Sequence, residues 1–80
     1  MNEEISFDYS SLRGKIIEQF GTIKNFSEKW GHSYNTVSRK LNNKVSFSLQ
    51  DIKETSKLLN IEPDEVPKYF FNLKVYKNKL

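Results

Sequence analysis

Four polar side chains share one face of a short helix predicted just before the middle of the chain: Tyr34, Asn35, Ser38 and Arg39. Asn35 and Arg39 are four residues apart, so their side chains point the same way from a helix. In the DNA major groove, asparagine can pair with N6 and N7 of adenine, and arginine with O6 and N7 of guanine. We therefore expect Asn35 and Arg39 to contact bases, with Tyr34 and Ser38 beside them. The alternative is that Asn35 and Arg39 are ordinary solvated helix residues.

Two helices joined by a tight turn, residues 22–41, would position this polar face. The first helix carries an apolar stripe and the second an apolar pair: Ile23, Phe26 and Trp30, then Val37 and Leu41. Their spacing of three and four residues is typical of helices with one buried side. Gly31 stands at the corner, and Ser33 can cap the second helix by accepting a hydrogen bond from a free backbone N–H group. The pattern predicts a helix-turn-helix motif.

Positive charge is concentrated on this motif and at the end of the chain. The formal net charge is only +3, but residues 22–48 carry +4 and residues 68–80 carry another +4. Such asymmetry suits a protein that presents one face to a polyanion, although lysines also occupy ordinary helix surfaces. Four polar residues of this region are candidates for phosphate contacts: Lys24, Lys40, Asn43 and Lys44. His32, in the turn, is expected to be hydrogen-bonded or solvated rather than a metal ligand.

A first helix is predicted before the motif, from Tyr9 to Phe20. Its inward stripe consists of four apolar residues: Leu12, Ile16, Ile17 and Phe20. Gly14 lies inside this helix, and we interpret it as the point of close approach by a neighbouring helix, with a frayed first turn as the alternative. Gly21 follows as a left-handed C-cap, and the chain then turns directly into Thr22, which can cap the next helix.

The second half of the chain predicts two more helices and a strand. One helix begins at its cap, Ser48, and ends at Asn60, with four side chains turned inward: Leu49, Ile52, Ser56 and Leu59. A shorter helix is predicted over residues 62–70, with a kink or early end at Pro67. The last stretch, residues 71–80, alternates apolar and polar residues, as a strand does. Because no second strand is predicted, we expect this one to pair with another copy of the chain or to lie over the core.

The composition excludes several classes of function. Eighty residues form one domain, and with no cysteine and one histidine there is neither a disulfide framework nor a cysteine-based metal site. No apolar run reaches the ~18 residues of a membrane span, and the acidic N-terminus does not resemble a signal peptide. The sequence shows no nucleophile–histidine constellation and no glycine-rich phosphate loop. We therefore expect neither enzyme activity nor a cofactor, metal, small-molecule substrate or membrane partner.

Four segments resemble the helix-turn-helix domain of the Cro and lambda-repressor type, and more narrowly a group of short phage-encoded regulators: residues 7–22 (FDYSSLRGKIIEQFGT), 27–31 (SEKWG), 33–44 and 62–71 (EPDEVPKYFF). The resemblance implies an all-α, five-helix lambda-repressor-like DNA-binding domain, with a short C-terminal strand or an extended basic tail at residues 72–80. It also implies a homodimer on a palindromic operator in the cytoplasm of a bacterial host cell. The family often has glutamine where Ile23 stands, which shifts the expected phosphate contacts to Thr22 and Lys24.

Two interpretations of function remain open. The leading one is a sequence-specific DNA-binding repressor of the Cro type, whose partners are double-stranded operator DNA and a second copy of itself. The alternative is a protein-interaction module, such as an antirepressor that binds another regulator through Phe70, Phe71 and the tail. Alanine at Asn35 and Arg39 would separate the two, because a DNA reader would lose specificity and a protein binder would keep its partner.

Overall fold

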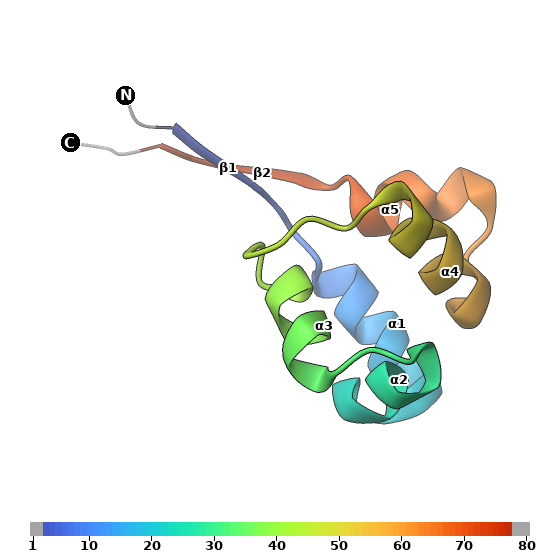
Figure 1. The fold of residues 1–80 in the computed structure, drawn as a ribbon. Coiled ribbons are helices and arrows are strands. Elements are labelled where there is room, and N and C mark those ends of the chain that lie inside the picture. Colours follow the sequence, from blue (N-terminus) through green and yellow to red (C-terminus); the bar gives the residue numbers. More distant parts are fainter. Residues whose placement is uncertain (1–2, 78–80) are drawn as a thin grey trace.

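Five α-helices and a two-stranded sheet make up the described part of the chain, which in the computed structural model is residues 3–77, with side chains for residues 6–74. In chain order the elements are β1 (Glu3–Phe7), α1 (Ser10–Phe20), α2 (Ile23–Trp30), α3 (Tyr34–Leu41), α4 (Leu49–Leu59), a 3-10 helix (Pro63–Glu65), α5 (Val66–Phe70) and β2 (Leu73–Lys77). Figure 1 shows the helices gathered into one body, from which the two strands extend. The prediction of a mostly helical domain is confirmed.

Three helices begin at the hydroxyl caps that the sequence predicts. Thr22 Oγ1 accepts a hydrogen bond from the backbone N–H of Asn25 at 3.0 Å, at the start of α2. Ser33 caps α3 in the same way, and Ser48 caps α4. At α4 the cap is reciprocal, because the Asp51 carboxylate also accepts from the Ser48 backbone N–H at 2.9 Å. Each cap satisfies a backbone donor that a helix start leaves free, which fixes where the helix begins.

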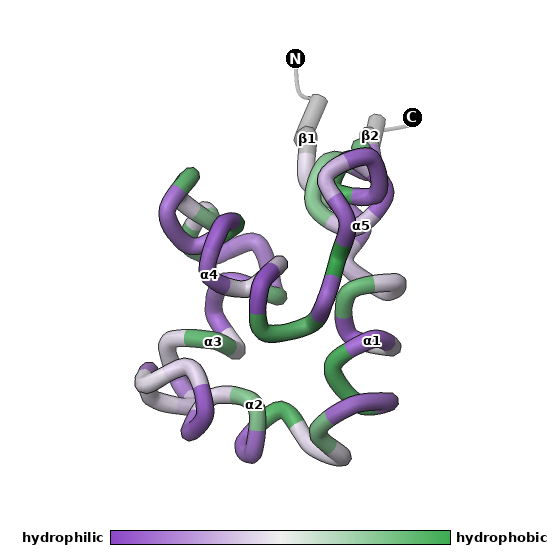
Figure 2. The backbone as a smooth tube through the Cα atoms, turned by 90° about the vertical axis from the view of Figure 1, so that its right-hand side faces the viewer, coloured by the Kyte–Doolittle hydropathy of each residue, from purple (hydrophilic) through white to green (hydrophobic). Residues whose placement is uncertain are grey.

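The core is formed by side chains from all five helices. The fully or nearly buried apolar residues on these helices are Leu12, Ile16, Phe26, Val37, Leu41, Leu59, Tyr69 and Phe70. Helix α1 contacts α2, α4 and α5, so it holds the two halves of the body together. Hydrophobic and hydrophilic segments alternate along α1 in Figure 2, as expected for a helix with one buried side.

Two of the predicted inward residues are exposed. Ile17 on α1 is 47% exposed, and Leu49, the first residue of α4, is 79% exposed. The buried stripe of α4 instead runs through Ile52, Thr55 and Leu59, with Thr55 fully buried. The prediction for Leu49 is wrong because the Ser48 cap makes Leu49 the first residue of α4, and this end of the helix extends past the core.

Gly14 does not mark a close approach by another helix. A Cβ atom added at Gly14 would meet no heavy atom within 4 Å, and the residue is exposed within α1. The C-cap expected at Gly21 is present, with a φ of 84° and its backbone N–H bonded to the Ile17 carbonyl. Of these two positions, only Gly21 has a backbone conformation that favours glycine.

The expected C-terminal strand exists, but its partner lies within the same chain. β2 pairs antiparallel with β1, in a register that places Ile5 opposite Val75 and Phe7 opposite Leu73. The prediction of a lone strand pairing with a second copy is therefore wrong. It missed β1 because five residues at the N-terminus carry too little pattern to identify a strand. In Figure 1 both strands run away from the helices together, as a ribbon of β1 and β2.

The predicted fifth helix is divided into two pieces at its prolines. Pro63 opens the 3-10 helix, and Pro67 is the second residue of α5, where its missing N–H group breaks no helical bond. Pro67 therefore helps to begin a helix rather than to end one. No helix within residues 3–77 is long and apolar enough to cross a membrane.

Candidate functional site

Helices α2 and α3 meet at Gly31, as the motif at residues 22–41 predicts. Gly31 adopts a left-handed conformation with a φ of 87°, and its backbone N–H donates to the Ser27 carbonyl at 2.9 Å. The His32 N–H donates to the same carbonyl at 3.1 Å. Ser27 is buried at this corner, and its hydroxyl donates to the Ile23 carbonyl at 2.8 Å. The turn therefore closes on hydrogen bonds from the end of α2, which sets the direction of α3.

The outer face of α3 carries the residues predicted to contact bases. Tyr34 is 55% exposed, and Asn35 and Arg39 are also exposed. Ser38 is half-buried, and its hydroxyl accepts a hydrogen bond from Asn42 Nδ2 at 3.3 Å. Arg13 of α1 reaches the same end of the helix, because its guanidinium donates to Asn42 Oδ1 at 2.8 Å. No local pattern in the sequence indicates this contribution of Arg13.

The five residues predicted to contact phosphate have different surroundings. Lys24 and Lys44 are exposed, on α2 and in the loop after α3. The Thr22 side chain caps α2 by accepting a hydrogen bond from the backbone N–H of Asn25. Lys40, which we expected on the outer face, is only 9% exposed, and its ammonium group lies 2.8 Å from Asp51 Oδ2. The fifth residue, Asn43, holds the β1–β2 ribbon, as described below.

The Lys40–Asp51 ion pair connects the end of α3 to the start of α4. Lys40 Nζ also donates to the Ser46 carbonyl at 3.3 Å, so a single lysine fastens the α3–α4 loop. Burial raises the pKa of Asp51, but hydrogen bonds from Lys40 and from the Ser48 backbone, with the charge of Lys40, outweigh it and leave the pKa below its ordinary value. Lys40 therefore has a structural partner, and its ammonium group does not face the outside.

Asn43 joins the end of α3 to the base of the ribbon. It adopts a left-handed conformation with a φ of 62°. Its side-chain oxygen accepts from the Phe7 backbone N–H at 2.9 Å, and its side-chain nitrogen donates to the Phe7 carbonyl at 2.9 Å. Both ends of the amide are therefore used within the chain. The role of Asn43 is to clip β1 to the helical body, where we had expected it to contact phosphate.

A polar cluster joins the helix-turn-helix corner to α4. The rings of Trp30 and His32 lie 4.1 Å apart, and Trp30 Nε1 donates to Glu54 Oε1 at 2.8 Å. Hydrogen bonds from Gln50 and from Trp30 lower the pKa of Glu54. One ligand atom each from His32, Asp51 and Glu54 lie within 4.8 Å of one another. Both carboxylates already accept hydrogen bonds from protein donors.

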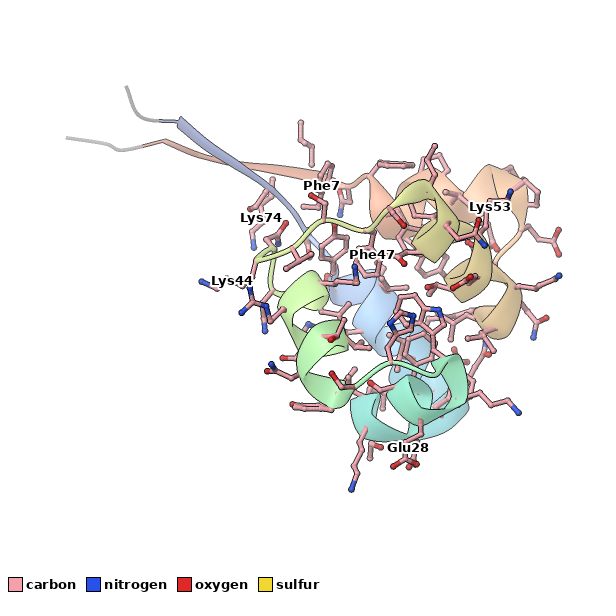
Figure 3. The ribbon with its side chains drawn as sticks, viewed as in Figure 1. Phe7, Glu28, Lys44, Phe47, Lys53 and Lys74 are labelled. Carbon is pink, nitrogen blue, oxygen red and sulfur yellow. The ribbon has the colours of Figure 1, made fainter. Side chains whose placement is uncertain are left out.

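A second feature, which we call the aromatic cavity, lies where the ribbon meets the helices. It has a volume of about 170 Å³, and five of its lining residues are aromatic: Phe7, Tyr9, Phe47, Phe70 and Phe71. The rings of Phe47 and Tyr9 meet edge to face at 5.2 Å, and those of Phe47 and Phe70 at 5.4 Å. Burial raises the pKa of the Tyr9 phenol. Figure 3 shows Phe7 and Phe47 in this region, between the ribbon and the α3–α4 loop.

This cavity has no local pattern in the sequence, because its residues come from the two ends and the middle of the chain. Aromatic residues make up 14% of the chain, but this share does not indicate which rings come together. Their assembly depends on the pairing of β1 with β2, which brings Phe7 close to Phe71, with ring centroids 6.3 Å apart.

Comparison with known proteins identifies a family and a similar solved structure. Residues 5–73 match the model of a family described as "Protein of unknown function (DUF739)". The solution structure of the modulator of repression (MOR) of the temperate bacteriophage TP901-1 from Lactococcus lactis is 49% identical in sequence, with a TM-score of 0.75. The match covers 84% of this chain and 90% of that one. No curated protein matches the chain.

These matches correct the predicted identity and function. The matched structure is that of a modulator of repression rather than a Cro-type repressor, so the assignment to the Cro family is wrong. The leading interpretation, a homodimeric repressor that binds operator DNA, is overturned by the same finding. The base contacts predicted for Tyr34, Asn35, Ser38 and Arg39 depended on that interpretation and stay a prediction, which neither the structure nor the matches test. With 69 of its 80 residues inside the family model, the chain belongs to the DUF739 family.

Proposed function

We propose that this protein modulates repression by binding another transcription regulator, which is the alternative that its sequence left open. The supporting observation is the 49% identity to the TP901-1 modulator of repression over 84% of the chain. At this identity, and with a TM-score of 0.75, the two chains share a fold. A modulator must act on the protein or the site that carries out repression, and a regulator protein is the partner that this interpretation favours.

The same proposal covers the domain, the mode of action and the location of the protein. The whole chain acts as one interaction domain, and the order of its helices, with α2 and α3 meeting at Gly31, supports a lambda-repressor-like arrangement. Its effect is stoichiometric binding rather than catalysis. It acts in the cytoplasm of a bacterial host, because the regulator it binds is found there.

Isothermal titration of the purified chain with the repressor encoded nearest to its gene tests the proposal. We expect a complex of fixed stoichiometry, and a change in the affinity of that repressor for its operator when the chain is added. Titration of the chain with operator DNA alone is the control, and it separates an effect on the repressor from competition for the DNA. Absence of heat and of any change in operator affinity would refute the proposal.

A further inference from the structure

Exposed apolar side chains are concentrated at the aromatic cavity. Val45 and Phe71 line it and are 40% and 50% exposed, and the exposed Leu73 pairs in register with Phe7, another lining residue. The other large apolar side chains that are exposed in the described region lie on three different helices: Ile17, Tyr34 and Leu49. A hollow with an apolar rim is typical of the place where a partner inserts a side chain.

The size of the cavity suits a single side chain. Its volume of about 170 Å³ is close to the ~150 Å³ of an engineered apolar cavity that binds benzene. It is therefore large enough for the side chain of a leucine or a phenylalanine, and too small for a whole helix. The cavity is also partly open, so a group can enter it without rearrangement of the helices.

Two polar groups of the cavity lining are paired within the chain. The amide of Asn43 uses both its oxygen and its nitrogen on the Phe7 backbone, and the Ser46 carbonyl accepts from Lys40 Nζ. The rest of the lining is mostly apolar, with five aromatic rings and the side chains of Val45 and Ile52. An apolar side chain fits these walls, whereas a polar one would lose its hydrogen bonds to water without replacement.

The rim of the cavity around Val45 and Leu73, which we call its mouth, is flanked by two lysines. Lys44 precedes Val45 and Lys74 follows Leu73, and both lysines are exposed. Figure 3 shows both lysines on the ribbon side of the molecule, and Lys53 over α4 on the other side. Asp8, one residue after β1, is held near Lys74, whose charge helps to lower the pKa of that carboxylate after hydrogen bonds from Ser10. Acidic residues on either side of the inserted side chain would complement this mouth.

Building on the proposed function, we propose that the aromatic cavity is the anchor point for the partner regulator and receives one apolar side chain flanked by acidic residues. A second copy of this chain fits the mouth less well. In a symmetric dimer the same surface of each copy faces the other, and this would place the two basic mouths against each other.

Two pairs of matched variants test the anchor. Val45→Asp places a charge at the mouth, and Leu49→Asp makes the same change at an exposed leucine at the start of α4. Lys44→Glu reverses a charge beside the mouth, and Lys53→Glu reverses one on α4. The affinity of each variant for the regulator is measured by isothermal titration, and its folding by a circular dichroism melt. We expect Val45→Asp and Lys44→Glu to weaken binding by about tenfold or more, and the two controls to stay within about twofold of the wild type.

The outcomes separate this inference from the function on which it rests. If the wild-type chain binds the regulator and all four variants bind equally well, the anchor is refuted and the proposed function stands. If the wild-type chain does not bind, both fail together. Light scattering on the chain alone gives a third readout: a stable dimer that Val45→Asp converts to a monomer would show that a second copy occupies the cavity, which overturns the proposal.

Discussion

The Lys40–Asp51 ion pair shows how much one residue contributes beyond its charge. Lys40 was expected to face a phosphate, yet its helix turns it inward, where Asp51 neutralises it and the Ser46 carbonyl accepts a second hydrogen bond. A buried charge is tolerated only when it is paired, so the position depends on its partner. Asp51 has a second task, because it also completes the cap of α4 with Ser48.

Replacing Asp51 with asparagine should destabilise the protein by about 2–3 kcal/mol. The change leaves the Lys40 charge without its partner in a nearly buried position, and the loss is below the full ~3–5 kcal/mol of a buried pair because both side chains retain some exposure, 11% and 13%. Urea unfolding followed by circular dichroism measures it. The double variant Lys40→Met with Asp51→Asn removes the unpaired charge and should recover part of the loss. Equal stability of the two variants would contradict the argument.

Because of the Asp51 carboxylate, the stability of the protein should also depend on pH in the acidic range. The folded-state pKa of Asp51 lies below its ordinary value of 3.8, so the folded form favours the charged state. The stabilisation is therefore fully present above pH 3.8 and is lost as the pH falls through the lowered folded-state value. Thermal melts between pH 5 and pH 2 should show a fall in wild-type Tm that is shallower in Asp51→Asn. Parallel curves for the two proteins would show that other carboxylates cause the fall.

At the scale of elements, the residues at which helices begin could be predicted from the sequence. Which side chains of a helix are buried by its neighbours could not. The side chains of Thr22, Ser33 and Ser48 each accept a hydrogen bond from the backbone N–H three residues further along. These caps can therefore be predicted from the local sequence alone. The burial of Lys40 and the exposure of Leu49 depend on what the neighbouring helices cover, which local spacing does not contain. The polar face of α3 was located correctly at Asn35 and Arg39, but its chemistry is shared by many surfaces and did not determine the function.

Two glycines should respond in opposite ways to the same substitution. Gly14 lies within α1 with open space at its Cβ position, so Gly14→Ala should stabilise the protein by about 0.5–1 kcal/mol. Gly31 also has open space, but its φ of 87° is unfavourable for alanine, and Gly31→Ala should cost about 1–2 kcal/mol. Thermal melts of the two variants give the sign directly. A stabilising Gly31→Ala would mean that the corner does not need its left-handed conformation.

At the scale of the whole molecule, a helical body and a projecting ribbon are joined at a few points. The extents of 43 × 28 × 22 Å reflect the ribbon, which in Figure 1 continues well beyond the helices. A two-stranded ribbon is only marginally stable by itself, so its order depends on its base. There the Asp8 N–H donates to the Asn72 carbonyl at 2.7 Å, and Asn43 clips the Phe7 backbone to the end of α3. These contacts span the sequence from end to middle, which is why local pattern could not reveal them.

The two hydrogen bonds between Asn43 and the Phe7 backbone should stabilise the ribbon more than they stabilise the helices. Asn43→Gly keeps the left-handed backbone, which glycine adopts freely, and removes both hydrogen bonds to Phe7. Amide hydrogen exchange of β1 and β2 should therefore become clearly faster, while the amides of α1 and α3 keep most of their protection, since each lost bond contributes only ~1 kcal/mol. Asn60→Gly makes the same change at the end of α4, where φ is 58°, and should leave the ribbon unaffected. If both variants change exchange evenly across the chain, the ribbon and the helices unfold as one unit, and the aromatic cavity between them is as rigid as the core.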